Sequence, residues 1–101
     1  MDPRAINRFI EPDNFPIPPT REVIDSLKGN KFFTEIDLED AFLQMRLSDE
    51  DQELLCFTWN KTQYAFVGTP YGVKIMSFQF QRLMSGVFAD FDFAKCYIDN
   101  I

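Results

Sequence analysis

Apolar side chains recur with the period of a helix in two regions of this chain. From residue 75 to about residue 91 they fall at positions 76, 80, 83, 84, 87, 88 and 91, which is the spacing of an amphipathic helix. A shorter helix is predicted from about residue 20 to 28, with Thr20 as its N-cap and Gly29 just past its end. Its apolar face carries Val23, Ile24 and Leu27.

Shorter β-prone runs fill the rest of the chain. Two of them, 54–59 and 63–68, flank the polar residues Asn60-Lys61-Thr62, which predicts a hairpin. Further strands are predicted at 32–37, 41–47 and 94–99. This order of helices and strands predicts an α+β fold, with helices on one face of an antiparallel sheet.

Composition predicts one small domain with a proline-rich start. Residues 1–19 hold five of the six prolines, which excludes a regular helix or central strand there and predicts an extended arm. The 101 residues are 46% apolar, enough for a single core, and twelve phenylalanines predict that aromatic packing supplies much of it.

Two carboxylates occupy positions that could carry chemistry. Asp37 closes the run 32–37, and Asp99 closes the run 94–99. Carboxylates at adjacent strand ends can hold a pair of Mg²⁺ ions, although aspartate is also common in ordinary turns. The chain has no histidine, so an imidazole base or ligand is excluded and any catalysis would rest on carboxylates.

Net charge and cysteine content limit which partners the chain is expected to bind and in which cellular compartment it is expected. The formal net charge is −6, whereas proteins that bind nucleic acid unaided usually carry a basic patch. Part of the acidic excess lies at 48–53, which predicts a solvated turn or a short helical start. Cys56 and Cys96 have no zinc or thioredoxin spacing and are predicted to be free, buried strand thiols. With no signal peptide or apolar span, we expect an intracellular protein, cytoplasmic or nuclear.

Several short motifs follow one another in a characteristic order. They are Asp2–Arg8, Phe15–Pro18, Leu27–Gly29, Phe33–Met45, Phe66–Val73, Phe80–Met84 and Tyr97–Ile101. In this order the chain resembles the reverse transcriptase domain of gypsy-type LTR retrotransposons, over essentially all 101 residues. The resemblance implies a partial right-hand polymerase palm with a ferredoxin-like sheet. In that domain, 1–19 would be a fingers arm and 20–101 the palm core with a fingers hairpin.

The resemblance also assigns roles to the two acidic positions. Asp37 and Asp99 match the metal carboxylates of the family, and the backbone carbonyl of Leu38 is a further oxygen ligand. The implied cofactor is Mg²⁺ or Mn²⁺. The implied activity is RNA-directed DNA polymerisation by two-metal nucleotidyl transfer, with dNTPs and an RNA or DNA template-primer as partners.

Other positions match the family's nucleotide contacts. Phe42 would pack under the sugar of the incoming nucleotide and exclude a 2′-hydroxyl, and Tyr71 and Gly72 would lie beside the nucleotide. From the residues themselves, Phe42 could equally be a core side chain and Tyr71-Gly72 an ordinary turn after proline.

Four polar residues match the family outside the metal and nucleotide positions. Arg4 and Asn7 match polar positions of the fingers arm, although by themselves they would be surface residues. Gln81 and Arg82 match positions of the long helix and are expected to face solvent or template.

Position 100 departs from the family pattern, because Asn100 replaces the second aspartate of the Tyr-x-Asp-Asp box. An amide supplies a neutral oxygen and cannot offset the charge of Mg²⁺. The catalytic set would therefore be Asp37, Asp99 and Asn100, and we expect the isolated chain to be inactive or severely impaired. The alternative function is a retroelement-derived α+β interaction module without catalysis. In either case we expect weak or no nucleic-acid binding, and self-association through an open strand edge at 94–101.

Overall fold

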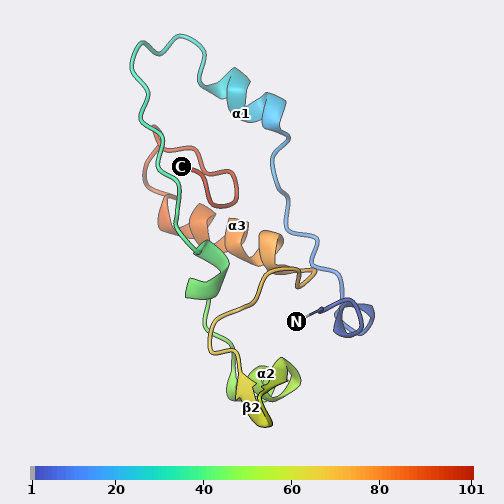
Figure 1. The fold of residues 1–101 in the computed structure, drawn as a ribbon. Coiled ribbons are helices and arrows are strands. Elements are labelled where there is room, and N and C mark those ends of the chain that lie inside the picture. Colours follow the sequence, from blue (N-terminus) through green and yellow to red (C-terminus); the bar gives the residue numbers. More distant parts are fainter. Residues whose placement is uncertain (1) are drawn as a thin grey trace. The chain divides into compact units, whose positions relative to one another are not determined.

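The computed structural model describes residues 2–101 and combines short helices with one antiparallel hairpin (Figure 1). Its elements are η1 (Ile6–Arg8), α1 (Thr20–Ser26), η2 (Ala41–Gln44), α2 (Asp49–Leu54), β1 (Cys56–Trp59), β2 (Thr62–Ala65) and α3 (Met76–Val87). This confirms the predicted α+β class. The chain forms two compact units: the first comprises the residues up to Pro12 with Asp40–Met76, and the second comprises Asp13–Glu39 with Ser77–Ile101.

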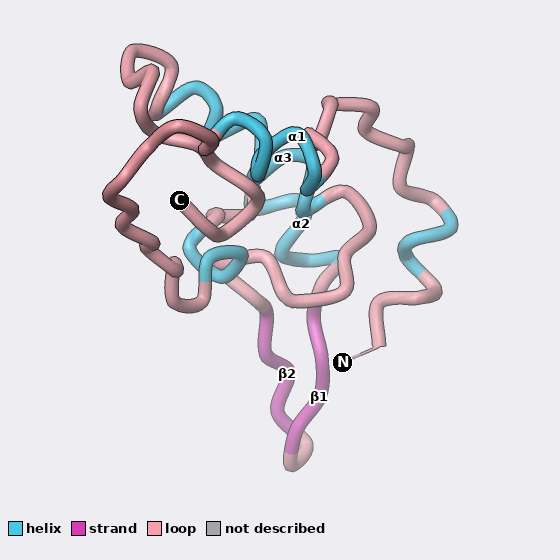
Figure 2. The backbone as a smooth tube through the Cα atoms, turned by 90° about the horizontal axis from the view of Figure 1, so that it is seen from above, coloured by secondary structure: helices cyan, strands magenta, loops and turns pink. Residues whose placement is uncertain are grey.

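The hairpin of the first unit confirms the sequence prediction (Figure 2). Strands β1 and β2 pair from Cys56 opposite Ala65 to Trp59 opposite Thr62, so Thr62 belongs to the strand and not to the loop. The two loop residues, Asn60 and Lys61, have φ values of 47° and 63°. Two successive positive φ values give the type I′ turn, whose twist matches that of the flanking strands.

The acidic segment in the same unit is a short helix, as predicted. Helix α2 is capped by Ser48, whose hydroxyl accepts a hydrogen bond from the Asp51 amide at 3.1 Å. Three acidic residues in its first turn complement the positive end of the helix dipole.

The predicted strand at 41–47 is wrong. Asp40 adopts a left-handed conformation with φ 50°, and a 3-10 helix, η2, begins directly after it. Pairing with the chain near Gly68 is limited to an isolated bridge from Arg46, flanked by a hydrogen bond from the Leu47 amide to the Val67 carbonyl at 2.9 Å. The left-handed residue turns the backbone before a strand can extend.

Helix α1 of the second unit begins and ends earlier than predicted. Thr20 is its first residue, and Pro19 occupies the N-cap position without a capping side-chain hydrogen bond, so the predicted Thr20 cap is wrong. The helix ends at Ser26, and Gly29 lies beyond it with φ 89°. Proline suits the start of a helix because its missing N–H would have no partner there.

The predicted strands at 32–37 and 94–99 are also wrong as regular strands. Figure 1 traces the green segment before η2 beside the red C-terminal segment, but the two pair over only a few residues. Residues 32–36 are extended and largely exposed. Their apolar alternation predicted a strand that has too few backbone partners to form.

The core is small and not built mainly of phenylalanine. Its apolar members are Ala41, Leu55, Met76, Phe80 and Met84. Within residues 2–101 Phe80 is the one buried phenylalanine, while Phe32 is 93% exposed, so the predicted aromatic core is wrong. Both cysteines are free and half-buried, and Cys96 lies outside any strand. No helix in the described part of the chain has the length and apolar character needed to cross a bilayer.

Candidate functional site

A tight turn near the C-terminus of the second unit carries one of the candidate metal ligands. The Tyr97 amide donates to the Asn100 carbonyl at 2.8 Å, and the Asn100 amide donates back to the Tyr97 carbonyl at 3.1 Å. Ile98 and Asp99 are the two central residues, and Ile98 has φ 57°. A positive φ is strained for a β-branched residue, so surrounding contacts must hold this turn.

The segment that carries Asp37 pairs directly with this turn. The Ile36 and Ile101 backbones exchange two hydrogen bonds of 2.8 and 2.9 Å, and the Leu38 amide donates to the Asp99 carbonyl at 3.0 Å. Asp37 is thereby the bridge partner of Asn100. Asp37, which is 62 residues before Asp99 in the sequence, thus pairs with the backbone that carries Asp99 and Asn100, in one unit.

The side chains at these positions differ in exposure and charge. Asp37 is exposed, whereas Leu38, Asp99 and Asn100 are half-buried. The Asn100 side-chain amide donates to Asp99 Oδ1 at 3.3 Å. The position where the family has a third carboxylate is therefore occupied by a hydrogen-bond donor to the second.

The donor set fits a hard divalent cation that a ligand helps to hold. Residues 2–101 contain no cluster of three or more His, Cys, Asp or Glu side chains with metal-binding geometry. Mg²⁺ is usually held by one or two carboxylates, with substrate phosphates and water completing its octahedron. In such a site Asp37 and Asp99 would supply the two carboxylates, and the Leu38 carbonyl would supply a further oxygen.

Gln81 on α3 contacts the same turn, contrary to its predicted exposure. Its side chain is only 3% exposed. Its Nε2 donates to the Cys96 carbonyl at 3.0 Å and its Oε1 accepts from the Ile98 amide at 2.8 Å. The neighbouring Arg82 is exposed as predicted, and its guanidinium pairs with Asp13 at 2.7 Å.

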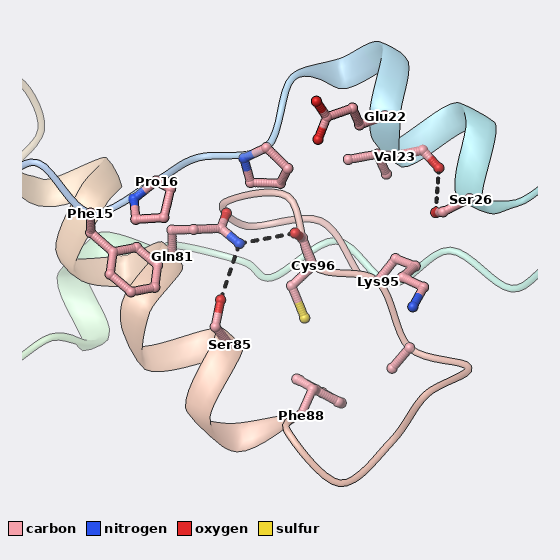
Figure 3. Close-up of a pocket in the computed structure, with 12 residues that line it drawn as sticks. Phe15, Pro16, Glu22, Val23, Ser26, Gln81, Ser85, Phe88, Lys95 and Cys96 are labelled. Atoms are coloured by element: carbon pink, nitrogen blue, oxygen red, sulfur yellow. Dashed lines mark hydrogen bonds between the residues drawn. The ribbon is translucent and has the colours of Figure 1, made fainter.

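A cavity of about 470 Å³ adjoins these contacts within the second unit (Figure 3). The proline-rich segment before α1, the α1 helix, α3 and residues 94–96 line it. The Cys96 thiol is among the lining groups, and burial raises its pKa. Gln81 and Ser85 border the same space from α3.

The predicted nucleotide residues come together in the first unit. The rings of Phe42 and Tyr71 lie 5.8 Å apart in an edge-to-face arrangement. The Tyr71 hydroxyl donates to Asp40 Oδ1 at 3.2 Å. Phe42 is half-buried and Tyr71 is 56% exposed, so this aromatic pair presents one ring to solvent.

Gly72 is held beside this pair by the N-terminal arm. It has φ 91°, and a Cβ placed on it would lie 2.9 Å from Pro3 Cγ, so both conformation and space require glycine. The Asn7 side chain donates to the Gly72 carbonyl at 2.8 Å and accepts from the Lys74 amide at 2.9 Å. Asn7 is therefore a structural clamp, whereas Arg4 is exposed and pairs with the nearby Asp2.

Comparison with known proteins identifies the family. The family model described as reverse transcriptase (RNA-dependent DNA polymerase) matches residues 1–101. The chain belongs to the reverse transcriptase family. It is 30% identical over 97% of its length to the retrovirus-related Pol polyprotein from transposon 412 of Drosophila melanogaster. It is 32% identical over 97% of its length to that from transposon gypsy of the same organism, and 25% identical over its whole length to the Tf2-7 polyprotein of Schizosaccharomyces pombe.

The predicted resemblance to gypsy-type reverse transcriptases is thus confirmed. The chain spans 8 to 10% of the length of these polyproteins. Among solved structures it is similar to a foamy viral protease-reverse transcriptase in complex with an RNA/DNA hybrid. The TM-score is 0.87 at 20% identity, over 98% of this chain and 14% of that one. The likeness confirms a reverse transcriptase fold.

The sequence predicts no structural role for two carboxamides, Asn7 and Gln81. Each lies in a motif that matches the reverse transcriptase family, and that match was the only signal available. Neither lies on an apolar stripe or in a turn pattern that predicts burial. Their roles became visible only through their partners, which are 65 and 15 residues away along the chain.

Proposed function

We propose that the second unit carries the metal-binding core of an RNA-directed DNA polymerase. Asp37 and Asp99 would hold Mg²⁺ or Mn²⁺, with the Leu38 carbonyl as an additional oxygen. The observation that carries the proposal is the backbone pairing of residues 36–38 with 99–101, which sets both carboxylates at neighbouring register positions.

The proposed reaction is nucleotidyl transfer to a primer. When bound, a pair of such ions supplies activation of the primer 3′-hydroxyl and neutralises charge on the leaving pyrophosphate. Asp37 and Asp99 contribute the negative charge that holds the ions. The half-buried setting of Asp99 strengthens its attraction to a cation compared with a fully solvated carboxylate.

Because of Asn100, we expect the polymerase activity of this chain to be low. It contributes a neutral amide and turns its N–H donor toward Asp99. One unit charge at about 4 Å is worth about 4 kcal/mol at an effective dielectric constant of about 20. Losing even part of that from the transition state costs well over tenfold in rate, because each 1.4 kcal/mol is about a factor of ten. The chain itself would be inactive or severely impaired.

The first unit would supply contacts to the incoming nucleotide. Phe42 would pack under the sugar and favour dNTPs over rNTPs by excluding a 2′-hydroxyl, with Tyr71 and Gly72 beside it. The edge-to-face packing of Phe42 on Tyr71 supports this proposal because it fixes the orientation of the Phe42 ring. In the parent enzyme the further partner would be an RNA or DNA template-primer.

A Mn²⁺ titration of the ¹⁵N-labelled chain tests the metal site. Paramagnetic broadening should appear first at residues 36–38 and 97–101, and Asp37→Asn or Asp99→Asn should remove it. The exposed Asp92→Asn is the matched control and should leave it unchanged. Broadening confined to the acidic start of α2, or unaltered by the Asp37 and Asp99 variants, would refute the proposal.

A protein-interaction module without catalysis is the second candidate. It is favoured by the apolar side chains that are strongly exposed, such as Phe9, Phe32 and Phe93, at 84 to 93%. Exposed aromatic groups of this kind are more common at contact surfaces than on free ones. The same titration separates the candidates, since a module would give no broadening at Asp37 and Asp99.

A further inference from the structure

The Gln81 carboxamide makes a two-point contact with the backbone of the C-terminal segment. Its Nε2 donates to the Cys96 carbonyl at 3.0 Å, and its Oε1 accepts from the Ile98 amide at 2.8 Å. A third, longer contact joins Nε2 to Ser85 Oγ at 3.4 Å within the same helix (Figure 3). The side chain is 3% exposed, so water does not compete for these groups.

The two backbone groups that Gln81 meets are those that a neighbouring strand would bond. In an extended segment, the carbonyl of one residue and the amide of the residue two places later point to the same edge. Cys96 and Ile98 have this relation. One side-chain amide of α3 therefore takes the place of the N–H and C=O that one residue of an adjacent strand would offer. The strand edge that the sequence predicted to be open is closed at these positions.

This contact falls beside the strained residue of the turn. Ile98 has φ 57°, which a β-branched side chain adopts only when its surroundings enforce it. The Tyr97–Asn100 hydrogen bonds close the turn from within. Gln81 bonds the Ile98 amide from outside, and so ties the turn to α3.

We infer that Gln81 is a positioning residue for the proposed metal site, which holds the Tyr97–Asn100 turn so that Asp99 stays beside Asp37. The inference rests on the proposed function. Gln81 itself touches no metal ligand side chain; it acts through the backbone of Cys96 and Ile98. Without it, the Cys96 carbonyl and the Ile98 amide, both of half-buried residues, lose these partners, and the strained turn loses its tie to α3.

Gln81→Met tests the inference, because methionine keeps the length and apolar stem and removes both hydrogen bonds. Gln79→Met is the matched control, since Gln79 is half-buried on the same helix. In Gln81→Met, exchange of the Ile98 amide should accelerate at least tenfold, and the Mn²⁺ concentration needed to broaden residues 37 and 99 should rise severalfold. The Phe88 amide, which follows α3 and donates to the Met84 carbonyl, should keep its protection.

If Gln81→Met does not fold, two further measurements can still test whether Gln81 holds the turn. Gln81→Asn retains a carboxamide that is one methylene too short to span the contact, and should give the same local changes. In the unaltered chain, a scalar coupling across the hydrogen bond from the Ile98 nitrogen to the Gln81 Cδ should be detectable. Its absence would overturn the inference without any variant.

The outcomes separate the inference from the proposed function. Unchanged Ile98 exchange and unchanged Mn²⁺ response in a folded Gln81→Met chain would overturn the inference alone. Equal effects of Gln79→Met would overturn it as well, because the change would then not be specific to the contact. No broadening at residues 37 and 99 of the unaltered chain would refute the proposed function and the metal-positioning role. Ile98 exchange would still decide whether Gln81 holds the turn.

Discussion

Replacing Asn100 by aspartate should make the stability of this chain depend on divalent metal. The Asn100 amide now donates to Asp99 Oδ1 at 3.3 Å. In Asn100→Asp that hydrogen bond is lost and a second carboxylate faces the first. A divalent cation placed among Asp37, Asp99 and the new carboxylate would relieve the repulsion and gain a third charged ligand.

The loss of stability in Asn100→Asp can be worked out from the distance between the side chains at positions 99 and 100. Two like charges about 3.3 Å apart repel by roughly 1.3 kcal/mol in water and about 5 kcal/mol at an effective dielectric constant of about 20. Both residues are half-buried and their side chains can rotate apart, so we expect a loss of about 2 kcal/mol. For a domain of this size that lowers Tm by roughly 8 to 16 °C. Free metal at about 100 times its Kd returns about 2.7 kcal/mol, enough to offset the loss.

Thermal melts followed by circular dichroism measure the loss of stability in EDTA and its recovery in Mn²⁺. The matched control is Asn14→Asp, which adds the same charge at an exposed position of the same unit. Asn100→Asp should melt lower than the control in EDTA and gain more from Mn²⁺. Equal melting in EDTA, or an equal Mn²⁺ gain in all three proteins, would refute the proximity of the charges on which the reasoning depends.

Two further predictions concern packing and the cavity thiol. Gly68→Ala should destabilise the chain by more than about 3 kcal/mol in urea unfolding, because its Cβ would clash with the Leu43 backbone carbonyl. Gly86→Ala in α3 has open space around its Cβ and should stabilise the chain by about 0.5–1 kcal/mol. In a Cys56→Ser background, iodoacetamide at pH 8 should modify Cys96 more slowly in the folded chain than in urea, since burial raises its pKa. The neutral thiol favours the folded state below its unfolded pKa, so this stabilisation should fade as pH rises through the raised value. Equal rates in folded and unfolded chains would contradict it.

Local patterns predicted those elements whose stability is itself local. The apolar stripe predicted α3, although the helix ends at Val87 and not at about residue 91. The polar loop between two β-prone runs predicted the hairpin, and Asn60 at the first turn position suits its positive φ. In both cases the hydrogen-bond partners lie a few residues apart, so a short window of sequence contains the interaction.

The strand predictions failed where pairing depends on distant segments. Residues 32–37 have the alternation of a strand, yet their backbone bonds reach Asp99 and Ile101 over only a few positions. At 41–47 the left-handed Asp40 redirects the chain, and no periodicity in the sequence signals that conformation. The motif match singled out Asp37 and Asp99, and the backbone segments that carry them pair with each other. Their role as metal ligands stays a prediction, which rests on family information that periodicity does not contain.

Asn7 and Gln81 indicate how a chain with so little regular sheet keeps its functional segments in place. Each carboxamide donates to the carbonyl of one residue and accepts from the amide two residues later, at Gly72 and Lys74 in one case. Gln81 makes the same pair of bonds at Cys96 and Ile98. A carboxamide can do this because its C=O acceptor and an N–H donor lie side by side at the end of one side chain. Next to the proposed nucleotide and metal residues, these two side chains thus make backbone hydrogen bonds that a neighbouring strand would make in a larger sheet. Each site therefore depends on a single side chain, whereas a paired strand would hold it by several hydrogen bonds.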